Sequence, residues 1–455
     1  MNTPDTAERS TGTKTWHTVL QSAVMLLLYM IPHMPRQDVW IPFLLGLISL
    51  FFFVYVERNL RSSLQGHEER WFTAALLGFC AYLFVNSLWS QLPGVALGKA
   101  VFVLCMVLLA PFVARAFALQ SRSTMERTAL CALIGAVIGS MITAIEFSTD
   151  HVIGRTVFAT FPDIRPGDKT LEVLVKENGQ LVKLPESEYR RYDGDVTVKI
   201  ASSALNRIHS LRLLLLWPVL FLALYYARLR IGIVLTAFLA LTALYTIFAG
   251  DSQTAQVAMV LSAAAFVAAL FWINAVHWVL LGAWCMAVVL AIPLSIAPYA
   301  MGLHKADWIS PSFRDRMIIW EFTASQALKS PVLGIGVRST RVLNKKFKKT
   351  QTKLPGHIVP KRLGLHTHNN FLQVWFELGA IGAAFVLVIG IGLLQSIRRL
   401  IPTVKPYAYA TFVAACIVAA FGWGLWQTWL LAGYTLAIMM VAFINNYARK
   451  AGPRS

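Results

Sequence analysis

Residues 366–394 read HTHNNFLQVWFELGAIGAAFVLVIGIGLL, and this stretch decides the fold. From residue 371 to 394 it is apolar apart from Gln373 and Glu377. At about 1.5 Å per residue, a helix of that length crosses a hydrocarbon core of roughly 30 Å. Two histidines and two asparagines therefore stand where a membrane-spanning helix begins, and we expect the chemistry of the protein at that boundary.

Apolar segments of similar length recur along the chain, in which 57% of the 455 residues are hydrophobic and 14% are charged. That balance excludes an ordinary soluble protein. We predict an all-α polytopic integral membrane protein with about twelve transmembrane helices. The expected spans are residues 16–31, 40–56, 71–89, 95–119, 128–147, 204–226, 231–249, 254–273, 276–296, 371–394, 408–426 and 429–444.

The short loops indicate the orientation, because Lys and Arg in short loops stay on the cytoplasmic side. If the N-terminus is cytoplasmic, the short loops of the other face hold Arg36 and little else, with Lys99 a few residues into a span. The cytoplasmic loops then hold Arg58, Arg61, Arg70, Arg115, Arg122, Arg127, Arg228, Arg230, Arg398, Arg399 and Lys405. We therefore predict a cytoplasmic arm at residues 1–15, an uncleaved first helix and a cytoplasmic tail at residues 448–455.

This orientation places two long loops on the outer, periplasmic side. Transmembrane helices 1–5 (residues 16–148) are followed by a loop at residues 149–203. Its Glu177-Asn178-Gly179 favours a β-hairpin between residues 170–175 and 180–184, with a third short strand at 196–200. Helices 6–9 (residues 204–297) and 10–12 (residues 368–447) enclose a larger loop at 298–367, in which residues 308–328 have the spacing of an amphipathic helix.

The formal charge of +19 indicates an anionic ligand. Much of the excess lies in the large outer loop, for example at residues 345–349, although long loops cross a membrane regardless of charge. Basic patches bind phosphate whatever molecule carries it, so the membrane setting favours a lipid-linked or sugar-linked phosphate over nucleic acid. Contact of this charge with the head groups of membrane lipids is the alternative.

We expect no metal and no cofactor. The five cysteines lie in apolar runs and have neither a disulfide nor a zinc spacing; they are Cys80, Cys105, Cys131, Cys285 and Cys416. His366 and His368 are two residues apart, which on a helix would point them in different directions, and the next acidic residue is Glu377.

His368 is the candidate general base. An imidazole at a water–lipid boundary accepts a proton near neutral pH, and the positive end of the helix would lower its pKa and keep it neutral. His366, Asn369 and Asn370 are candidate supporting residues, because an Asn side chain can orient a base or hold a sugar hydroxyl. The alternative is a polar residue that only marks the end of the span.

Glu377 is a further candidate, because a carboxylate at membrane depth is costly unless it is paired or faces a polar cavity. It would otherwise stabilise the helix through an arginine on a neighbouring span.

Three arginines are candidate ligands of a pyrophosphate, because a guanidinium group binds phosphate oxygens in a bidentate manner. Arg207 opens the expected span at 204–226 from the outer side, Arg316 lies in the amphipathic segment, and Arg338 follows Gly-Ile-Gly at residues 334–336. Arg207 and Arg316 are the predicted pair, with Arg338 next. Arg314 and Trp320 flank Arg316 and are candidate supporting residues.

These residues resemble the O-antigen ligase and O-antigen polymerase superfamily, often called Wzy_C proteins. The ligase pattern is His-Asn, nine residues, Gly, two residues and then Gly, Thr or Tyr, and His368-Asn369, Gly379 and Gly382 match it. The resemblance extends over residues 204–444, with matches to the upstream loop signature and the central span at Arg316, Trp320, Pro331, residues 334–336 and Asn206-Arg207. Residues 251–253, Asp-Ser-Gln, depart from it, since many relatives place an arginine after the serine, and this puts a phosphate-binding role there in doubt.

The resemblance implies an inverting, metal-independent glycosyltransferase of lipopolysaccharide biosynthesis in the bacterial inner membrane. It would transfer O-antigen glycan from undecaprenyl pyrophosphate to the lipid A–core oligosaccharide on the periplasmic face. His368 would deprotonate the acceptor hydroxyl, while Arg207 and Arg316 would bind the pyrophosphate as it leaves.

Other activities compete with this interpretation. A Wzy-type polymerase, which joins two lipid-linked units, and a protein O-oligosaccharyltransferase would use the same kind of site. A polysaccharide transporter or flippase belongs to another class and predicts polar residues in broken helices near the bilayer midplane. Here the polar residues gather at the outer ends of spans and in outer loops.

Overall fold

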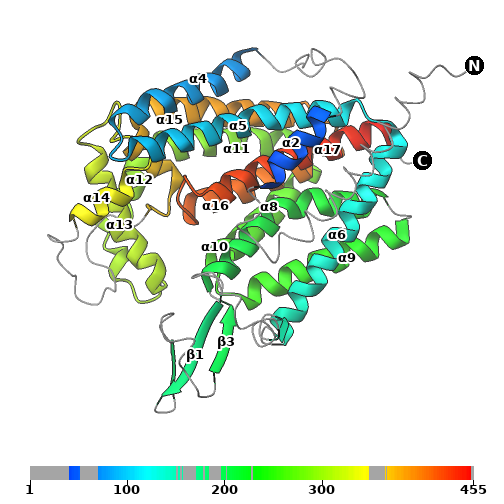
Figure 1. Cartoon of the computed structure of the whole chain (residues 1–455), viewed down its shortest axis with the longest axis horizontal. Coiled ribbons are helices and arrows are strands. Elements are labelled where there is room, and N and C mark those ends of the chain that lie inside the picture. Colours follow the sequence, from blue (N-terminus) through cyan, green and yellow to red (C-terminus); the bar gives the residue numbers. More distant parts are fainter. Residues whose placement is uncertain are drawn as a thin grey trace, which may run out of the picture.

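The computed structural model describes residues 40–51, 70–149, 152–153, 156, 171–177, 180–183, 196–200, 202–226, 229–347, 364 and 366–451. Within them the chain forms a bundle of long helices with a small sheet at its side (Figure 1). The expected arm at 1–15, the expected first span at 16–31 and residues 348–363 of the basic loop lie outside the described residues.

Eight described helices are long and apolar enough to cross a membrane, or nine if one bent pair is a single span. The eight are α4 (Arg70–Asn86, continued by η3, Ser87–Trp89), α5 (Pro93–Ala118), α6 (Arg122–Ser148), α8 (Ser202–Tyr226), α9 (Leu229–Ala249), α10 (Gln253–Phe271), α15 (Asn370–Arg398) and α17 (Thr428–Ala451). Two shorter apolar helices are α2 (Trp40–Phe51) and α16 (Lys405–Phe421). The prediction of a multi-pass helical membrane protein is confirmed, and every expected span from residue 40 onward corresponds to one of these helices or to the bent pair.

The expected span at residues 276–296 is bent. The chain forms two helices there, α11 (Ile273–Val289) and α12 (Ala291–Ala300), which meet at an angle of 75°. Pro293 stands in the first turn of α12 and has no N–H to donate to the carbonyl of Val289, so the helical hydrogen bonding stops at that point. The second helix of the pair therefore turns away from the direction of the span.

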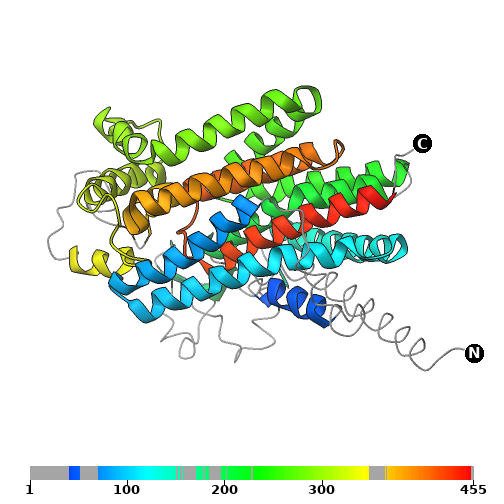
Figure 2. The same ribbon diagram turned by 90° about the horizontal axis from the view of Figure 1, so that it is seen from above.

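The bundle is organised around α8, whose apolar window is 83% buried. Its side chains pack with those of α9, α16 and α17 in the largest core cluster, which includes Leu214, Phe221 and Phe443. A second cluster joins α4, α5, α11 and α15 around Leu83 and Leu378. In the view from above, α15 lies beside α11 and α4, so the two clusters occupy different parts of one bundle (Figure 2).

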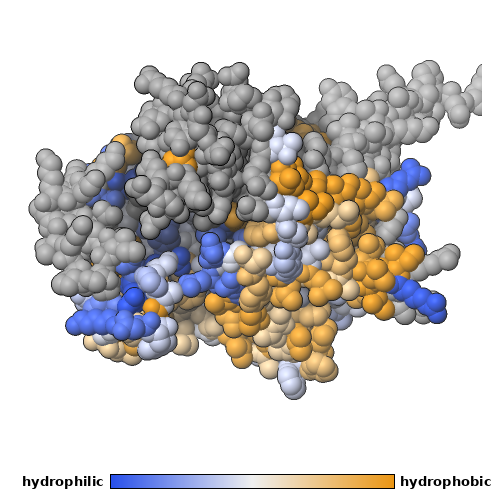
Figure 3. Space-filling view, turned by 90° about the horizontal axis from the view of Figure 1, so that it is seen from below, coloured by the Kyte–Doolittle hydropathy of each residue, from blue (hydrophilic) through white to orange (hydrophobic). Residues whose placement is uncertain are grey.

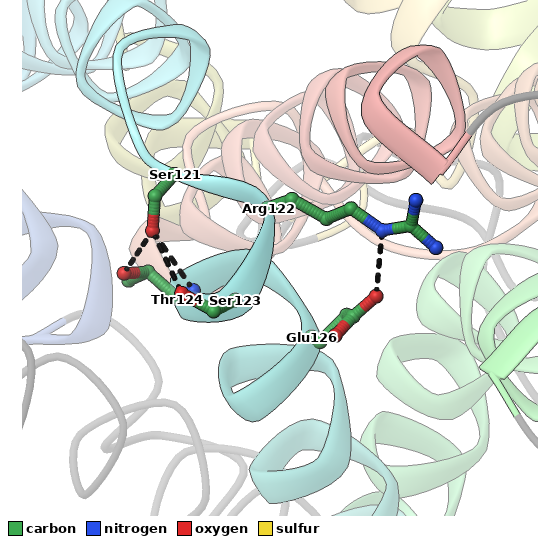
Figure 4. Close-up of polar contacts among 5 residues, drawn as sticks. All are labelled: Ser121, Arg122, Ser123, Thr124 and Glu126. Carbon is green, nitrogen blue, oxygen red and sulfur yellow. Dashed lines mark hydrogen bonds and ion pairs between the residues drawn. The ribbon is translucent and has the colours of Figure 1, made fainter.

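The start of α6 shows how a helix end at the periphery is satisfied (Figure 4). Ser121 is the N-cap, and its hydroxyl oxygen accepts a hydrogen bond of 3.2 Å from the backbone N–H of Thr124. In the first turn of α6, Arg122 and Glu126 form an exposed ion pair of 2.9 Å. Both contacts are local and lie far from the candidate site described below.

The span α15 is interrupted at Gly379, which has a φ of 65° and a ψ of −165°. A loop at residues 331–336 inserts at the break. The N–H groups of Ile335 and Gly336 donate to the carbonyls of Phe376 and Glu377, and the N–H groups of Ala380 and Ile381 donate to Pro331 and Val332; these four bonds measure 3.1, 3.0, 2.8 and 3.3 Å. The broken helix therefore keeps its backbone paired through a segment from another part of the chain.

The long segment before α15 contains η5 (Leu303–Lys305), α13 (Pro311–Ala327) and α14 (Thr340–Phe347). α13 confirms a helix within residues 308–328, but its apolar residues are not confined to one face as expected. The segment between α6 and α8 contains three strands, β1 (Leu171–Glu177), β2 (Gln180–Lys183) and β3 (Val196–Ile200), in the order β2-β1-β3. Glu177 pairs with Gln180 in an antiparallel register, as the hairpin prediction requires, although residues 178–179 lie outside the described part.

The two ends of the bundle along its long axis are formed by different elements. α13 and α14 lie at one end, and the last turns of α17 lie at the other, next to the label of the C-terminus (Figure 1). The face seen from below is hydrophilic and hollowed toward the end with α13, and it is largely apolar toward the opposite end (Figure 3).

Candidate functional site

A cavity of about 640 Å³ opens at the end of the bundle that carries α13. The start of α8, the loop between α9 and α10, α13, the residues before α15 and the loop between α16 and α17 contribute to its wall. Its lining residues are Asn206, Ser210, Asp251, Ser252, Gln253, Thr254, Ser310, Pro311, Ser312, Asp315, Arg316, Ile319, His368, Gly422 and Trp423. The volume suits a small ligand or one part of a larger one.

His368 lines this cavity, two residues before α15 begins. Its φ of 54° is rare for a residue with a side chain, and strain of this kind persists where the surroundings fix it. Nδ1 of His368 lies 2.8 Å from the carbonyl oxygen of Gly422. Because a carbonyl oxygen only accepts, Nδ1 carries the hydrogen, and Nε2 keeps a lone pair that can take a proton.

Burial and, to a smaller extent, the positive charge of Arg316 lower the pKa of His368 to about 4, against the hydrogen bond to Gly422, which raises it. We expected a lowered pKa because of the helix end. The lowering has another cause, since α15 starts at Asn370 and Asn369 caps it, its Oδ1 accepting a 3.1 Å bond from the N–H of Leu372. The imidazole is neutral at physiological pH.

His366 lies against His368, with ring centroids 4.0 Å apart. The expectation that the two rings point apart is wrong, because both residues precede the helix and the left-handed backbone of His368 turns the chain between them. Burial and the neighbouring His368 and Arg316 lower the pKa of His366 well below its usual range. His366 also packs against Gly424, because a Cβ added to Gly424 would lie 2.5 Å from Cβ of His366.

Arg316 is the guanidinium group that lines the cavity with His368. It donates to the carbonyl of Phe421 at 2.7 Å and lies 3.5 Å from the hydroxyl of Thr254. Burial lowers the pKa of Arg316 from its ordinary value, although a guanidinium stays charged at neutral pH. Trp320, one turn further along α13, donates to the carbonyl of Thr367 at 2.8 Å and so ties the helix to the residues before His368.

Arg207 is buried, with 6% of its surface exposed, and its guanidinium carbon lies 5.7 Å from the ring centroid of Trp423. Trp423 lines the cavity, as does Asn206 beside Arg207. Arg207 therefore stands behind the aromatic wall, and it is not one of the residues that line the cavity.

Arg338 lies elsewhere. Its backbone N–H donates to Oε2 of Glu377 at 2.8 Å, and its guanidinium group is 3.4 Å from the carbonyl of Trp426. Burial and the neighbouring Arg341 lower the pKa of Arg338, and Glu377 raises it. The structure does not bring Arg338 to the wall of the cavity.

Glu377 is fully buried and does not face the cavity. Its carboxylate accepts hydrogen bonds from the N–H of Arg338 and of Thr340, from the Thr340 hydroxyl, from Nε2 of Gln373 and from Nε1 of Trp426. The expected partner, an arginine side chain on a neighbouring span, is replaced by these donors. Glu377 thereby holds the loop before α14 and the loop between α16 and α17 against α15.

The other supporting candidates have different surroundings. Arg314 forms an ion pair of 3.0 Å with Asp307 at the surface, away from the cavity lining. Asn370 is buried at the start of α15, and its Oδ1 has no hydrogen-bond partner within the described residues. Asn369 caps α15 by accepting a hydrogen bond from a residue of that same helix.

Sequence reasoning missed the segment Phe421-Gly422-Trp423. It provides the two carbonyls that bind Arg316 and His368, and the aromatic ring that separates Arg207 from the cavity. Backbone carbonyls carry no residue signal, and the paired tryptophans of this loop are as typical of a membrane boundary as of a binding site. The described residues include no group of three or more His, Cys, Asp or Glu placed to hold a metal.

The comparisons with known proteins concern the middle of the chain. Residues 238–387 match the family model Wzy_C, described as O-antigen ligase. Two curated proteins named "Putative polysaccharide ligase", from Rickettsia typhi and Rickettsia prowazekii, are each 30% identical over 141 residues, which is 30% of this chain and 33% of the relative. The chain thus matches about a third of the length of these relatives. The region that contributes α13, Arg316 and His368 to the cavity is similar to the Wzy_C O-antigen ligase family.

Proposed function

We propose that this membrane protein is an O-antigen ligase. It transfers glycan from undecaprenyl pyrophosphate to a hydroxyl of the lipid A–core oligosaccharide, with inversion and without a metal, on the periplasmic face of the inner membrane. The observation that carries the proposal is one cavity that is lined by both a neutral histidine with a free Nε2 and a half-buried arginine. The family similarity of residues 238–387 supports the same class of reaction.

In the proposed reaction the acceptor hydroxyl gives its proton to Nε2 of His368 as its oxygen bonds to C1 of the donor sugar. The bond between C1 and the pyrophosphate oxygen breaks, and the electron pair leaves with the lipid pyrophosphate. Arg316 lies where it can stabilise that growing negative charge. Arg207 is the proposed second cation, and its charge acts on the leaving group through Trp423, which lies between it and the cavity. Arg338 acts from a distance, through its place beside Glu377 and Trp426.

Replacing His368 by alanine tests this proposal. The purified full-length protein is incubated with lipid-linked glycan and rough lipopolysaccharide, and the product is followed as a slower band. His368→Ala is expected to abolish transfer while the protein level stays unchanged, because no other group offers a free imidazole nitrogen to the cavity among its lining residues.

His304→Asn is the matched control. His304 is a buried histidine of the same outer loop that stacks on Tyr299, outside the cavity. Wild-type transfer by His368→Ala would remove that residue from the mechanism.

A polymerase would use the same groups, and omission of the acceptor separates the two activities. With a single lipid-linked donor and no lipid A–core, only a polymerase makes longer chains. We expect no chain growth in that reaction.

A further inference from the structure

The cavity has a mouth and a floor of different chemistry. After Pro311 at its start, the lining residues of α13 are Ser312, Asp315, Arg316 and Ile319, with the spacing of three and four residues that places them on one face of a helix. Ser312 is exposed, Asp315 and Arg316 are half-buried, and Ile319 is buried. The cavity therefore deepens along this helix from its first turn toward its middle.

A second part of the cavity wall, at the end of α9 and the start of α10, also has exposed and buried lining residues. Asp251 and Gln253 are exposed, whereas Ser252 is buried. The hydroxyl of Ser310 donates to Oε1 of Gln253 at 2.9 Å, which fixes this part of the wall against the first turn of α13. Asp251 and the α13 side chains thus belong to one rim.

The charges of the lining residues differ along the wall. Asp251 brings a carboxylate to the exposed rim and Asp315 brings one to the half-buried wall beside Arg316, while Arg316 contacts the carbonyl of Phe421 and His368 contacts the carbonyl of Gly422. A carboxylate accepts hydrogen bonds from hydroxyl groups and repels another anion. Asn206, which also lines the cavity, has a buried Oδ1 without a hydrogen-bond partner in the described part of the chain.

We propose that the mouth of the cavity is a subsite for a sugar residue without negative charge, whose hydroxyl groups donate to Asp251 and Asp315, and that it rejects a sugar that carries a carboxylate. The proposal rests on the proposed function, because it assumes that the leaving pyrophosphate binds at Arg316. The sugar next to the pyrophosphate then reaches the rim. The preference arises from repulsion of the wrong ligand as much as from binding of the right one.

Two synthetic donors test the inference with the purified full-length protein. Both are polyprenyl pyrophosphate disaccharides, and they differ only in the sugar next to the pyrophosphate, which is glucose in one and glucuronic acid in the other. We expect wild-type kcat/KM to favour the neutral donor by about tenfold or more. Asp251→Asn is expected to shrink this ratio several-fold, mainly because transfer from the acidic donor rises, and Asp315→Asn is expected to act in the same direction.

Asp307→Asn is the matched control, since Asp307 is an exposed carboxylate near the start of α13 that pairs with Arg314 outside the cavity. Its ratio should equal that of the wild type. Added salt should also reduce the wild-type preference, because ions screen repulsion at an exposed rim.

The outcomes separate the two proposals. Transfer from both donors at equal rates, or a ratio that Asp251→Asn leaves unchanged, would overturn the uncharged-sugar subsite while the ligase activity stands. Absence of transfer from either donor by the wild-type protein, with lipid A–core present, would overturn the proposed function and the subsite with it.

Discussion

The carbonyl of Gly422 determines which nitrogen of His368 carries the proton. Its oxygen lies 2.8 Å from Nδ1, so the hydrogen sits there and Nε2 is the basic atom. A backbone acceptor keeps the same tautomer whatever the protonation of nearby side chains. A residue without a side chain of its own therefore sets the role of the proposed catalytic base.

The pH dependence of transfer tests this arrangement. Burial, with the charge of Arg316, lowers the pKa of His368 from 6.5 to about 4. The neutral form is the active one, so activity is present above this pKa and is lost below it as Nε2 gains a proton. We expect kcat/KM, which reports the free enzyme, to fall as the pH falls through about 4 in a pH–rate profile of the purified protein. A fall near 6.5 would contradict the prediction.

Arg316→Gln should move that profile as well as lower the rate. Loss of the neighbouring positive charge raises the pKa of His368, so the acid limb should shift to higher pH. Arg314→Gln is the control, because Arg314 is two residues away on α13 and pairs with Asp307 at the surface. An unmoved acid limb in Arg316→Gln would show that the two groups do not interact.

The types of residue in the sequence were enough to predict that His368 and Arg316 lie together, but not the surroundings of Arg207. His368 and Arg316 were expected to share a ligand, and they line one cavity. Arg207 was expected to face it, but a tryptophan from the loop between α16 and α17 covers the guanidinium group. The sequence places that tryptophan far from Arg207, so only the fold could reveal the contact.

At the scale of elements, the break in α15 explains Gly379, the first glycine of the His-Asn pattern. Gly379 has a φ of 65°, and a Cβ there would lie 2.2 Å from the carbonyl oxygen of Val332. A glycine at this position is thus a backbone requirement, because the inserted loop and the broken helix approach too closely for a side chain.

Gly379→Ala should destabilise the protein by about 3 kcal/mol or more, from backbone strain together with the steric clash. The loss should appear as lower yield and a lower temperature of unfolding in detergent. Gly94→Ala is the control, since a Cβ at Gly94 in α5 meets no atom within 4 Å. Equal melting temperatures for the two variants would show that the break tolerates a side chain.

Glu377→Gln should be nearly as damaging as Glu377→Ala. Both carboxylate oxygens accept hydrogen bonds, so the amide nitrogen of glutamine would face donors such as the N–H of Arg338 or Thr340. Leaving buried donors unsatisfied costs about 2 kcal/mol or more. Thermal unfolding measures the loss, and transfer should fall with it because the loop that holds His368 loosens.

Glu126→Gln is the control for this change. Its exposed pair with Arg122 contributes less than about 0.5 kcal/mol, so its melting temperature should match the wild type. A mild effect of Glu377→Gln, on the other hand, would mean that the carboxylate is not an obligatory acceptor.

Hydropathy predicted the helices but not their interruptions. The lengths of α5, α8 and α15 follow from apolar runs. The break at Gly379 depends on contacts with residues 331–336, a distant segment that a periodic pattern does not encode. The bend after α11 lies at Pro293, inside an apolar run that hydropathy alone predicts as one span.

For the whole molecule, the cavity and the turn between α15 and α16 lie at opposite ends of the bundle. α15 starts beside His368 and runs to Arg398, and α16 starts at Lys405 and returns to the cavity at Phe421. The positive-inside rule predicts that the cavity end is periplasmic. This assignment stays a prediction.

Cysteine labelling in intact cells tests the orientation. Ser312→Cys at the mouth and Thr403→Cys at the other end both replace an exposed hydroxyl residue. A membrane-impermeant maleimide should label Ser312→Cys in spheroplasts and should label Thr403→Cys only after permeabilisation. The reverse pattern would place the cavity in the cytoplasm and exclude a periplasmic ligase.

The interruption of α15 also constrains the order of biogenesis. The carbonyls of Phe376 and Glu377 find their donors in residues 331–336, which the ribosome makes earlier and which lie outside the span itself. Until that earlier segment docks, a newly inserted α15 would expose unpaired carbonyls inside lipid, which is costly. Maturation of this span must therefore wait for residues 331–336 to dock, so that the candidate site is completed only at a late step of membrane assembly.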